Sequence, residues 1–176
     1  MKKAFTLMEI NLAILIMATG ILSILGLYSL GYRENRQSRE DVASAAYADA
    51  VMSPLVMALS ATNVKWSAFR RIPSQPSNKG WADYLNQSTG VVSSDPEGKA
   101  KAAFSSVMGQ LGPAASGLNR WPPSAAAAGL RAGLVIMHDE DSSVVRIAFR
   151  ATKHPAELLA MPLYYTEVRF QGVPNE

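Results

Sequence analysis

The stretch Lys2-Lys3-Ala4-Phe5-Thr6-Leu7-Met8-Glu9 opens the chain, and no charged residue follows it until Arg33. A helix of roughly 20 residues crosses a hydrocarbon layer about 30 Å thick, so residues 10–32 are long enough to span a membrane. Glu9 stands at the edge of this apolar run, where an ionised carboxylate is costly unless it has a partner or a route to water. A plain membrane anchor has no use for such an acid.

Two ordinary membrane segments fit only part of this pattern. A cleavable secretory signal has an apolar stretch of about 7 to 15 residues that ends in small residues. Residues 10–32 form a longer run that follows an acid and ends at Leu30-Gly31-Tyr32. A simple signal anchor tolerates this length, but neither interpretation gives Glu9 a role.

The same residues resemble the N-termini of type IV prepilins and of the pseudopilins of type II secretion. In that family a short basic leader ends in a small residue, Phe is the first mature residue, and Glu is the fifth. Lys2 and Lys3 match the leader, Ala4 the small residue, Phe5 the new N-terminus and Glu9 the acid. The match is confined to about residues 1–35 and departs at Ala4, where the family usually has Gly.

The resemblance implies a processing step and an assembly contact. A membrane aspartic peptidase would cut between Ala4 and Phe5, and the freed amine of Phe5 would be methylated. Gly at the cut lets the backbone approach a protease without steric cost, so Ala4 is expected to slow cleavage rather than prevent it. The Glu9 carboxylate would pair with the N-terminal amine of a neighbouring subunit, an attraction that is strong where the dielectric is low. The implied partners are other subunits, the peptidase and the membrane.

The apolar run contains Gly20, Gly26 and Gly31. Glycine weakens a helix in water but is common in membrane helices, because it lets neighbouring helices pack closely. Many pilins have a helix-bending proline at the position of Gly26, so the resemblance implies helix flexibility there. An ordinary apolar helix with a few small residues explains these glycines equally well.

Charges on both sides of the run leave its orientation open. Lys2 and Lys3 precede it, and Arg33, Arg36 and Arg39 follow it, so a rule that counts Lys and Arg gives no clear answer. The resemblance implies a single pass through the bacterial inner membrane, with the N-terminus cytoplasmic and the C-terminal domain outside.

Composition limits what the remaining residues can do. The 176-residue chain has room for one modest domain beyond the apolar run. It contains no cysteine, which excludes disulfides and thiolate sites. The formal charge of +3 falls to +1 when Lys2 and Lys3 are discounted, so we expect no nucleic-acid partner.

The helix is expected to continue beyond the membrane. Apolar residues recur at three- and four-residue spacing over residues 33–59, which predicts one buried stripe. They are Val42, Ala45, Ala46, Val51, Met52, Leu55, Val56 and Leu59. Pro54 removes a helical hydrogen bond and is expected to kink the helix or end it early.

Residues 61–131 are rich in proline, glycine and serine, which indicates loops and short helices. One helix is readable, with Asp95 as its N-cap, Pro96 at its first position and Gly112 after its end. Its apolar face should pack on the sheet or the long helix. The three tryptophans are most simply packing residues: Trp66, Trp81 and Trp121.

The last third predicts a three-stranded antiparallel sheet. Residues 134–137 and 144–149 flank a polar stretch and form a hairpin, and residues 163–170 form a third strand. Val145, Ile147 and Phe149 should face the core, while the residues between and after them look away: Arg146, Ala148 and Arg150.

The expected fold class is therefore α+β and pilin-like, with a long N-terminal helix packed on a small sheet. The expected segments are a leader (1–4), a membrane half-helix (5–32), an amphipathic half-helix (33–60) and a globular domain (61–176).

Candidate chemistry is thin. His138 and His154 lie near no nucleophile motif, and surface positions are expected for both. Asp139 and Asp141 are weak candidates for calcium ligands, but the run lacks the glycine and the spaced ligands of a calcium loop. We expect a solvated turn there, with no catalytic residues, cofactor or small-molecule substrate.

Two functions from different classes remain open. The first is a structural subunit that leaves the membrane to join a pilus or a secretion pseudopilus, with a minor subunit favoured. The second is a single-pass exterior domain that binds a ligand or protein partner without assembly.

Overall fold

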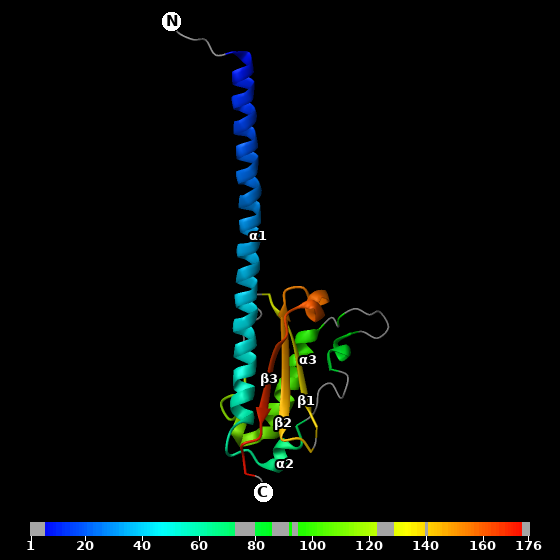
Figure 1. The fold of residues 1–176 in the computed structure, drawn as a ribbon. Helices are drawn as coiled ribbons and strands as arrows, with labels where there is room; N and C mark the ends of the chain where they lie inside the picture. Colours follow the sequence, from blue (N-terminus) through cyan, green and yellow to red (C-terminus); the bar gives the residue numbers. More distant parts are fainter. Residues whose placement is uncertain are drawn as a thin grey trace. The chain divides into compact units, whose positions relative to one another are not determined.

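The computed structural model describes residues 6–72, 80–85, 92, 95–122, 129–139 and 141–173. The chain divides into two compact units, Met1–Val42 and Ala43–Glu176. Helix α1 (Leu7–Leu59) runs through the first unit and into the second (Figure 1). The second unit also holds the remaining helices and a three-stranded antiparallel sheet. The fold is thus α+β, with a long apolar N-terminal helix and a small sheet.

Helix α1 continues past Pro54 to Leu59. Of the two expected effects of Pro54, an early end of the helix is excluded, and a kink stays a prediction. The residues around the proline explain this, since Val51, Leu55 and Leu59 are completely buried in the core. Packing of that face holds the last turns although Pro54 has no N–H to donate.

The buried stripe of α1 is offset from the predicted one. Val42, Ala45 and Ala46 are exposed, so these three predictions are wrong. The buried face instead begins with the following residues: Ser44, Tyr47, Ala48 and Val51. Tyr47 anchors it by edge-to-face contacts with Phe149 and Trp121, at centroid distances of 5.4 and 6.2 Å.

Helix α3 (Pro96–Leu111) has the ends that the sequence predicts. The Asp95 side chain accepts a hydrogen bond of 2.8 Å from the amide of Gly98, and Pro96 occupies the first turn. Gly112 closes the helix with a φ of 54°, a conformation that favours glycine. Glu97 is buried beside Arg131 and Lys101, at 3.4 and 3.1 Å.

The sheet has the order β1-β2-β3, from β1 (Arg131–His138), β2 (Val144–Thr152) and β3 (Tyr164–Arg169). Both pairs are antiparallel, and Ile147 pairs with Ile136 on one side and Thr166 on the other. The predicted hairpin and third strand are confirmed, and β1 begins three residues earlier than predicted.

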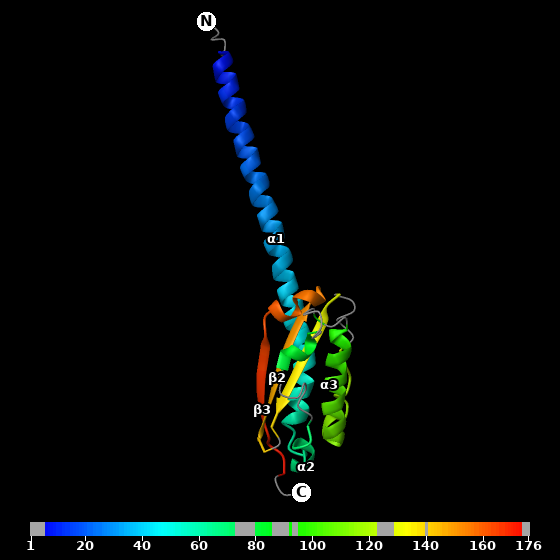
Figure 2. The ribbon, with the colours of Figure 1, turned by 90° about the vertical axis from the view of Figure 1, so that its right-hand side faces the viewer.

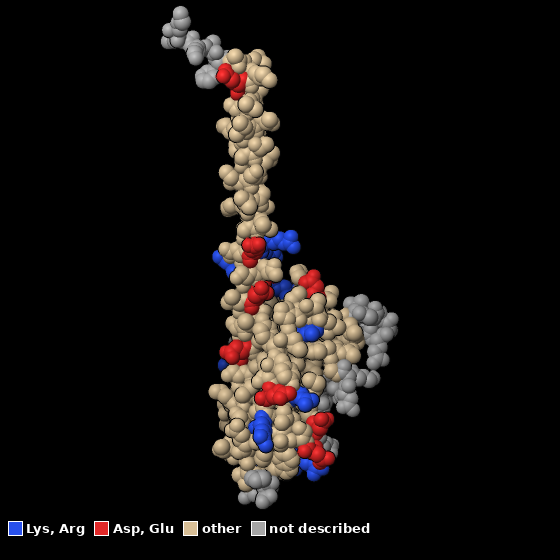
Figure 3. All heavy atoms as spheres, viewed as in Figure 1, with Lys and Arg blue, Asp and Glu red and all other residues tan. Residues whose placement is uncertain are grey.

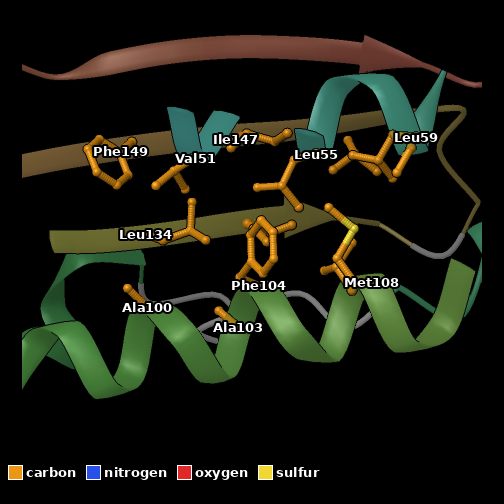
Figure 4. Packing of buried hydrophobic residues seen from close by; sticks show 14 of the residues in the cluster. Val51, Leu55, Leu59, Ala100, Ala103, Phe104, Met108, Leu134, Ile147 and Phe149 are labelled. Carbon is orange, nitrogen blue, oxygen red and sulfur yellow. The ribbon is translucent and has the colours of Figure 1, made fainter. Parts of the chain in front are cut away.

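The main core lies on one face of this sheet, covered by the end of α1 and by α3 (Figures 2 and 4). Val51, Leu55 and Leu59 come from α1, and Phe104 and Met108 come from α3. They meet strand residues that Figure 4 labels: Leu134, Ile147 and Phe149. The inward orientation predicted for the odd-numbered residues of β2 is confirmed.

A second apolar cluster covers part of the opposite face. It includes Val135, Ala148 and Tyr84, together with Leu158 from the 3₁₀ helix η3 (Pro155–Ala160). Ala148 was predicted to look away from the core. It does so, but it is only 1% exposed, because this second layer covers it.

Tyr84, at the end of the 3₁₀ helix η1 (Gly80–Tyr84), closes the free edge of β1. Its hydroxyl accepts a hydrogen bond from the amide of Leu134 at 2.8 Å and donates one to the carbonyl of Leu134 at 2.7 Å. Burial raises the pKa of Tyr84 to about 12. A single phenol thus satisfies the two backbone groups of Leu134 that this edge strand leaves open.

Candidate functional site

The start of α1 is a capping box. The carboxylate oxygen Oε2 of Glu9 accepts hydrogen bonds from the amide of Thr6 at 2.8 Å and from its hydroxyl at 3.0 Å. In return, the Glu9 amide donates to the Thr6 hydroxyl at 3.4 Å. Thr6 directly precedes the helix, and Glu9 is its third residue, which is the spacing of this motif.

This geometry corrects the reasoning from sequence about Glu9. Thr6 provides the Glu9 carboxylate with two donors within its own chain, in addition to any partner in a second subunit. The spacing Thr-x-x-Glu before an apolar run is itself a known helix-start signal, so the sequence contained the information. Thr6 brings no cation to the carboxylate, and both of its bonds end on Oε2, so Oε1 can still accept a hydrogen bond from another group.

The first unit presents an apolar surface. Between Leu7 and Tyr32 the large hydrophobic side chains are at least half exposed, and none of the most apolar 18-residue window of α1 is buried. The helix is long and apolar enough to cross a membrane, with a mean hydropathy of 2.3 in that window. Figure 3 shows this uncharged length of α1 between an acidic side chain near its start and the charged residues that follow.

The serine and threonine hydroxyls in this stretch bond within the helix. The hydroxyl of Thr19 donates to the carbonyl of Leu15 at 3.0 Å, and that of Ser23 donates to the carbonyl of Thr19 at 2.8 Å. Such bonds satisfy hydroxyl groups without water, as a helix in lipid requires.

Gly26 lies in unbroken helix, and a Cβ placed on it would meet nothing within 4 Å. Packing within the chain therefore does not require glycine at this position. Its role in helix flexibility stays a prediction.

The predicted leader and cleavage residues, Lys2, Lys3, Ala4 and Phe5, lie outside the described residues. Of the weak metal candidates, Asp141 forms an exposed ion pair with Arg70 at 3.5 Å. Among the residues that the structure describes, no group of three or more His, Cys, Asp or Glu side chains is placed to hold a metal ion.

The two histidines differ in burial. His154 is exposed as expected, whereas His138 is only 7% exposed, so its predicted surface position is wrong. Its ring packs edge-on against Phe69, with 5.2 Å between centroids, and its Nε2 lies 3.0 Å from the carbonyl oxygen of Ser142. His138 therefore helps to close the β1–β2 hairpin.

A groove of ≈ 520 Å³ lies in the second unit between α1 and β3. Apolar side chains such as Met52 and Val56 line it together with Asp49, and both Met57 and Tyr165 are about half exposed. The lining also includes the hydroxyl groups of Ser53 and Tyr164.

Comparison with known proteins gives no match, whether to protein-family models, to curated proteins or to solved structures.

Proposed function

We propose that this chain is a structural subunit, a pilin or pseudopilin of the minor type, that assembles from the bacterial inner membrane into a type IV pilus-like filament or a type II secretion pseudopilus. A prepilin peptidase cleaves it between Ala4 and Phe5. The N-terminus is cytoplasmic before cleavage, and the globular unit lies outside. The observation that carries the proposal is a capped Glu9 at the start of an exposed apolar helix.

The apolar surface of α1 supports the proposal because these side chains must be buried away from water. About twenty large and small apolar side chains of the first unit are exposed to solvent, which no water-soluble state tolerates. Lipid covers them before assembly, and the helices of neighbouring subunits cover them in a filament.

Glu9 supports the proposal because an ionised carboxylate at this position requires a cation, which the capping box does not supply. Thr6 fixes the carboxylate at the helix start but brings no positive charge. The methylated amine of a neighbouring Phe5 would neutralise it, with Oε1 as acceptor. Because either charge alone is penalised in a dry environment, this pairing fixes the axial register between subunits more than it adds net affinity.

The fold supports the proposal at a coarser level. A long apolar N-terminal helix followed by an antiparallel sheet is the α+β layout that the resemblance at residues 1–35 implies.

Two substitutions at Glu9 test the assembly role in cells that build such filaments. Glu9→Gln retains a side chain that can form the capping box but removes the charge, whereas Glu9→Ala removes both. We expect both variants to stay in the membrane fraction and to fall at least tenfold in the sheared filament fraction. Glu34→Gln, which removes an exposed acid beyond the apolar run, serves as the matched control and should assemble normally.

Normal assembly of Glu9→Gln would contradict the charge-pairing mechanism. A wild-type chain that stays in the membrane with Met1 intact would favour the other function, a membrane-anchored exterior domain that binds a partner.

A further inference from the structure

Four residues at the end of the apolar run form one face of α1, which we call the interfacial stripe: Tyr28, Tyr32, Arg36 and Arg39. Their spacing of four, four and three residues makes each the helical neighbour of the next. At 100° per residue they spread over about 80° of the helix circumference. The stripe lies entirely within the first unit.

The stripe is exposed and positive. Tyr28 is 76% and Tyr32 70% exposed, and both arginines are also exposed. The same helical geometry places Glu34 and Asp41 on the opposite side of α1. Glu40 lies beside the stripe and pairs with Arg36 at 3.2 Å, but this pair is exposed and therefore weak.

The position of the stripe along the helix matches the boundary of a bilayer. If Glu9 marks one boundary of the hydrocarbon layer, Tyr28 and Tyr32 follow about 30 Å along the axis, and the two arginines about 40–45 Å along it. Side chains on a helix lean toward its N-terminus, so the guanidinium groups of Arg36 and Arg39 reach back toward the headgroups. Tyrosines are typical of this boundary.

We propose that the interfacial stripe binds the phosphate of an anionic phospholipid. Arg36 and Arg39 can each present two parallel N–H donors to phosphate oxygens, while Tyr28 and Tyr32 pack their rings against the glycerol and upper acyl region. Glu34 and Asp41, on the opposite face of α1, repel an anionic headgroup, so the lipid binds on the side of the interfacial stripe. The inference rests on the membrane insertion in the proposed function but does not require filament assembly.

Native mass spectrometry of the full chain in a mild non-ionic detergent tests this site. The chain is mixed with equal amounts of phosphatidylglycerol and phosphatidylcholine, and the lipid that remains bound is counted. The wild type should retain phosphatidylglycerol preferentially. One arginine near an anionic surface typically strengthens binding about fivefold, so the double variant Arg36→Gln/Arg39→Gln should weaken retention roughly 25-fold.

The double variant Arg120→Gln/Arg169→Gln is the matched control, since it removes the same charge from exposed positions of the second unit. It should retain phosphatidylglycerol as the wild type does.

The double variant Arg36→Lys/Arg39→Lys keeps the positive charge but lacks the parallel N–H donors of the planar guanidinium group. We expect its lipid retention to lie between that of the wild type and that of the glutamine variant. Excess inorganic phosphate should not displace the lipid.

Equal retention by the stripe variant and the wild type would overturn the inference, and so would an equal loss in the control. Insertion into vesicles of the same two lipids, followed by flotation, separates this failure from that of the proposed function. A chain that floats with vesicles but shows no preference for phosphatidylglycerol refutes the lipid site alone, whereas a chain that does not float refutes the membrane-borne subunit as well.

Discussion

Replacing Tyr84 with phenylalanine tests how the free edge of the sheet is closed. The Tyr84 hydroxyl is the shared partner of the Leu134 amide and carbonyl, at 2.8 and 2.7 Å. Phenylalanine keeps the ring in the second apolar cluster and removes only these two bonds. A buried backbone group without a partner costs about 1–3 kcal/mol, so the loss of two should lower the free energy of unfolding by about 3 kcal/mol.

The expected readout is a lower melting temperature of the second unit. Its size implies roughly 3–5 °C for each kcal/mol, so Tyr84→Phe should melt about 10–15 °C below the wild type. Tryptophan fluorescence of the full chain in detergent follows this transition alone, because Trp66, Trp81 and Trp121 all belong to the second unit.

Tyr164→Phe is the matched control. It removes a hydroxyl that lies 2.9 Å from the Ser44 hydroxyl in a partly buried pair, for which we expect a loss of about 1 kcal/mol. If Tyr84→Phe melts no lower than Tyr164→Phe, the hydroxyl does not close the strand edge and the reasoning is refuted.

Three further predictions concern the pH dependence of stability, the cap of α3 and a tightly packed glycine in β1. Burial raises the pKa of Tyr84 to about 12, so its contribution to stability is complete below pH 10 and is lost as pH rises to 12; thermal melts across this range should fall less steeply for Tyr84→Phe than for the wild type. Asp95→Ala removes the cap of α3 and should cost about 1 kcal/mol in denaturation, while Asp95→Asn should cost much less. A Cβ at Gly133 would lie 2.7 Å from the Trp81 ring, so Gly133→Ala should destabilise by about 1–3 kcal/mol, whereas Gly109→Ala, with nothing within 4 Å, should not.

Local patterns were sufficient for much of the fold. The uncharged run after Glu9 predicted the exposed part of α1, and the Asp95, Pro96 and Gly112 signals placed both ends of α3 within a residue. These signals work because a cap or a long apolar run acts through neighbours along the chain. The alternation in β2 likewise identified its core face.

Features that depend on contacts between residues far apart in the chain could not be predicted from such local sequence patterns. Tyr47 is buried only because Phe149 and Trp121 meet it, and Ala148 is covered only because η3 returns over the sheet. His138 is buried for a similar reason, since Phe69 packs on its ring. None of these contacts produces a repeating pattern of apolar residues that could be recognised in the sequence.

The candidate site could be predicted in part. The motif of residues 4–9 identified Glu9 as unusual, and the Thr6-x-x-Glu9 spacing within it also predicts the cap that the structure shows. Capping the helix and carrying a charge are separate properties of the Glu9 side chain. Only the charge requires a cation from a second subunit. The two substitutions proposed at Glu9 separate them.

The N-terminus of the mature protein tests the central proposal most directly. Intact mass and peptide sequencing would be measured on the chain from cells with an active prepilin peptidase and from cells without one. The proposed function predicts a chain that starts at N-methylated Phe5 in the first cells and at Met1 in the second. An unprocessed chain in both would contradict it.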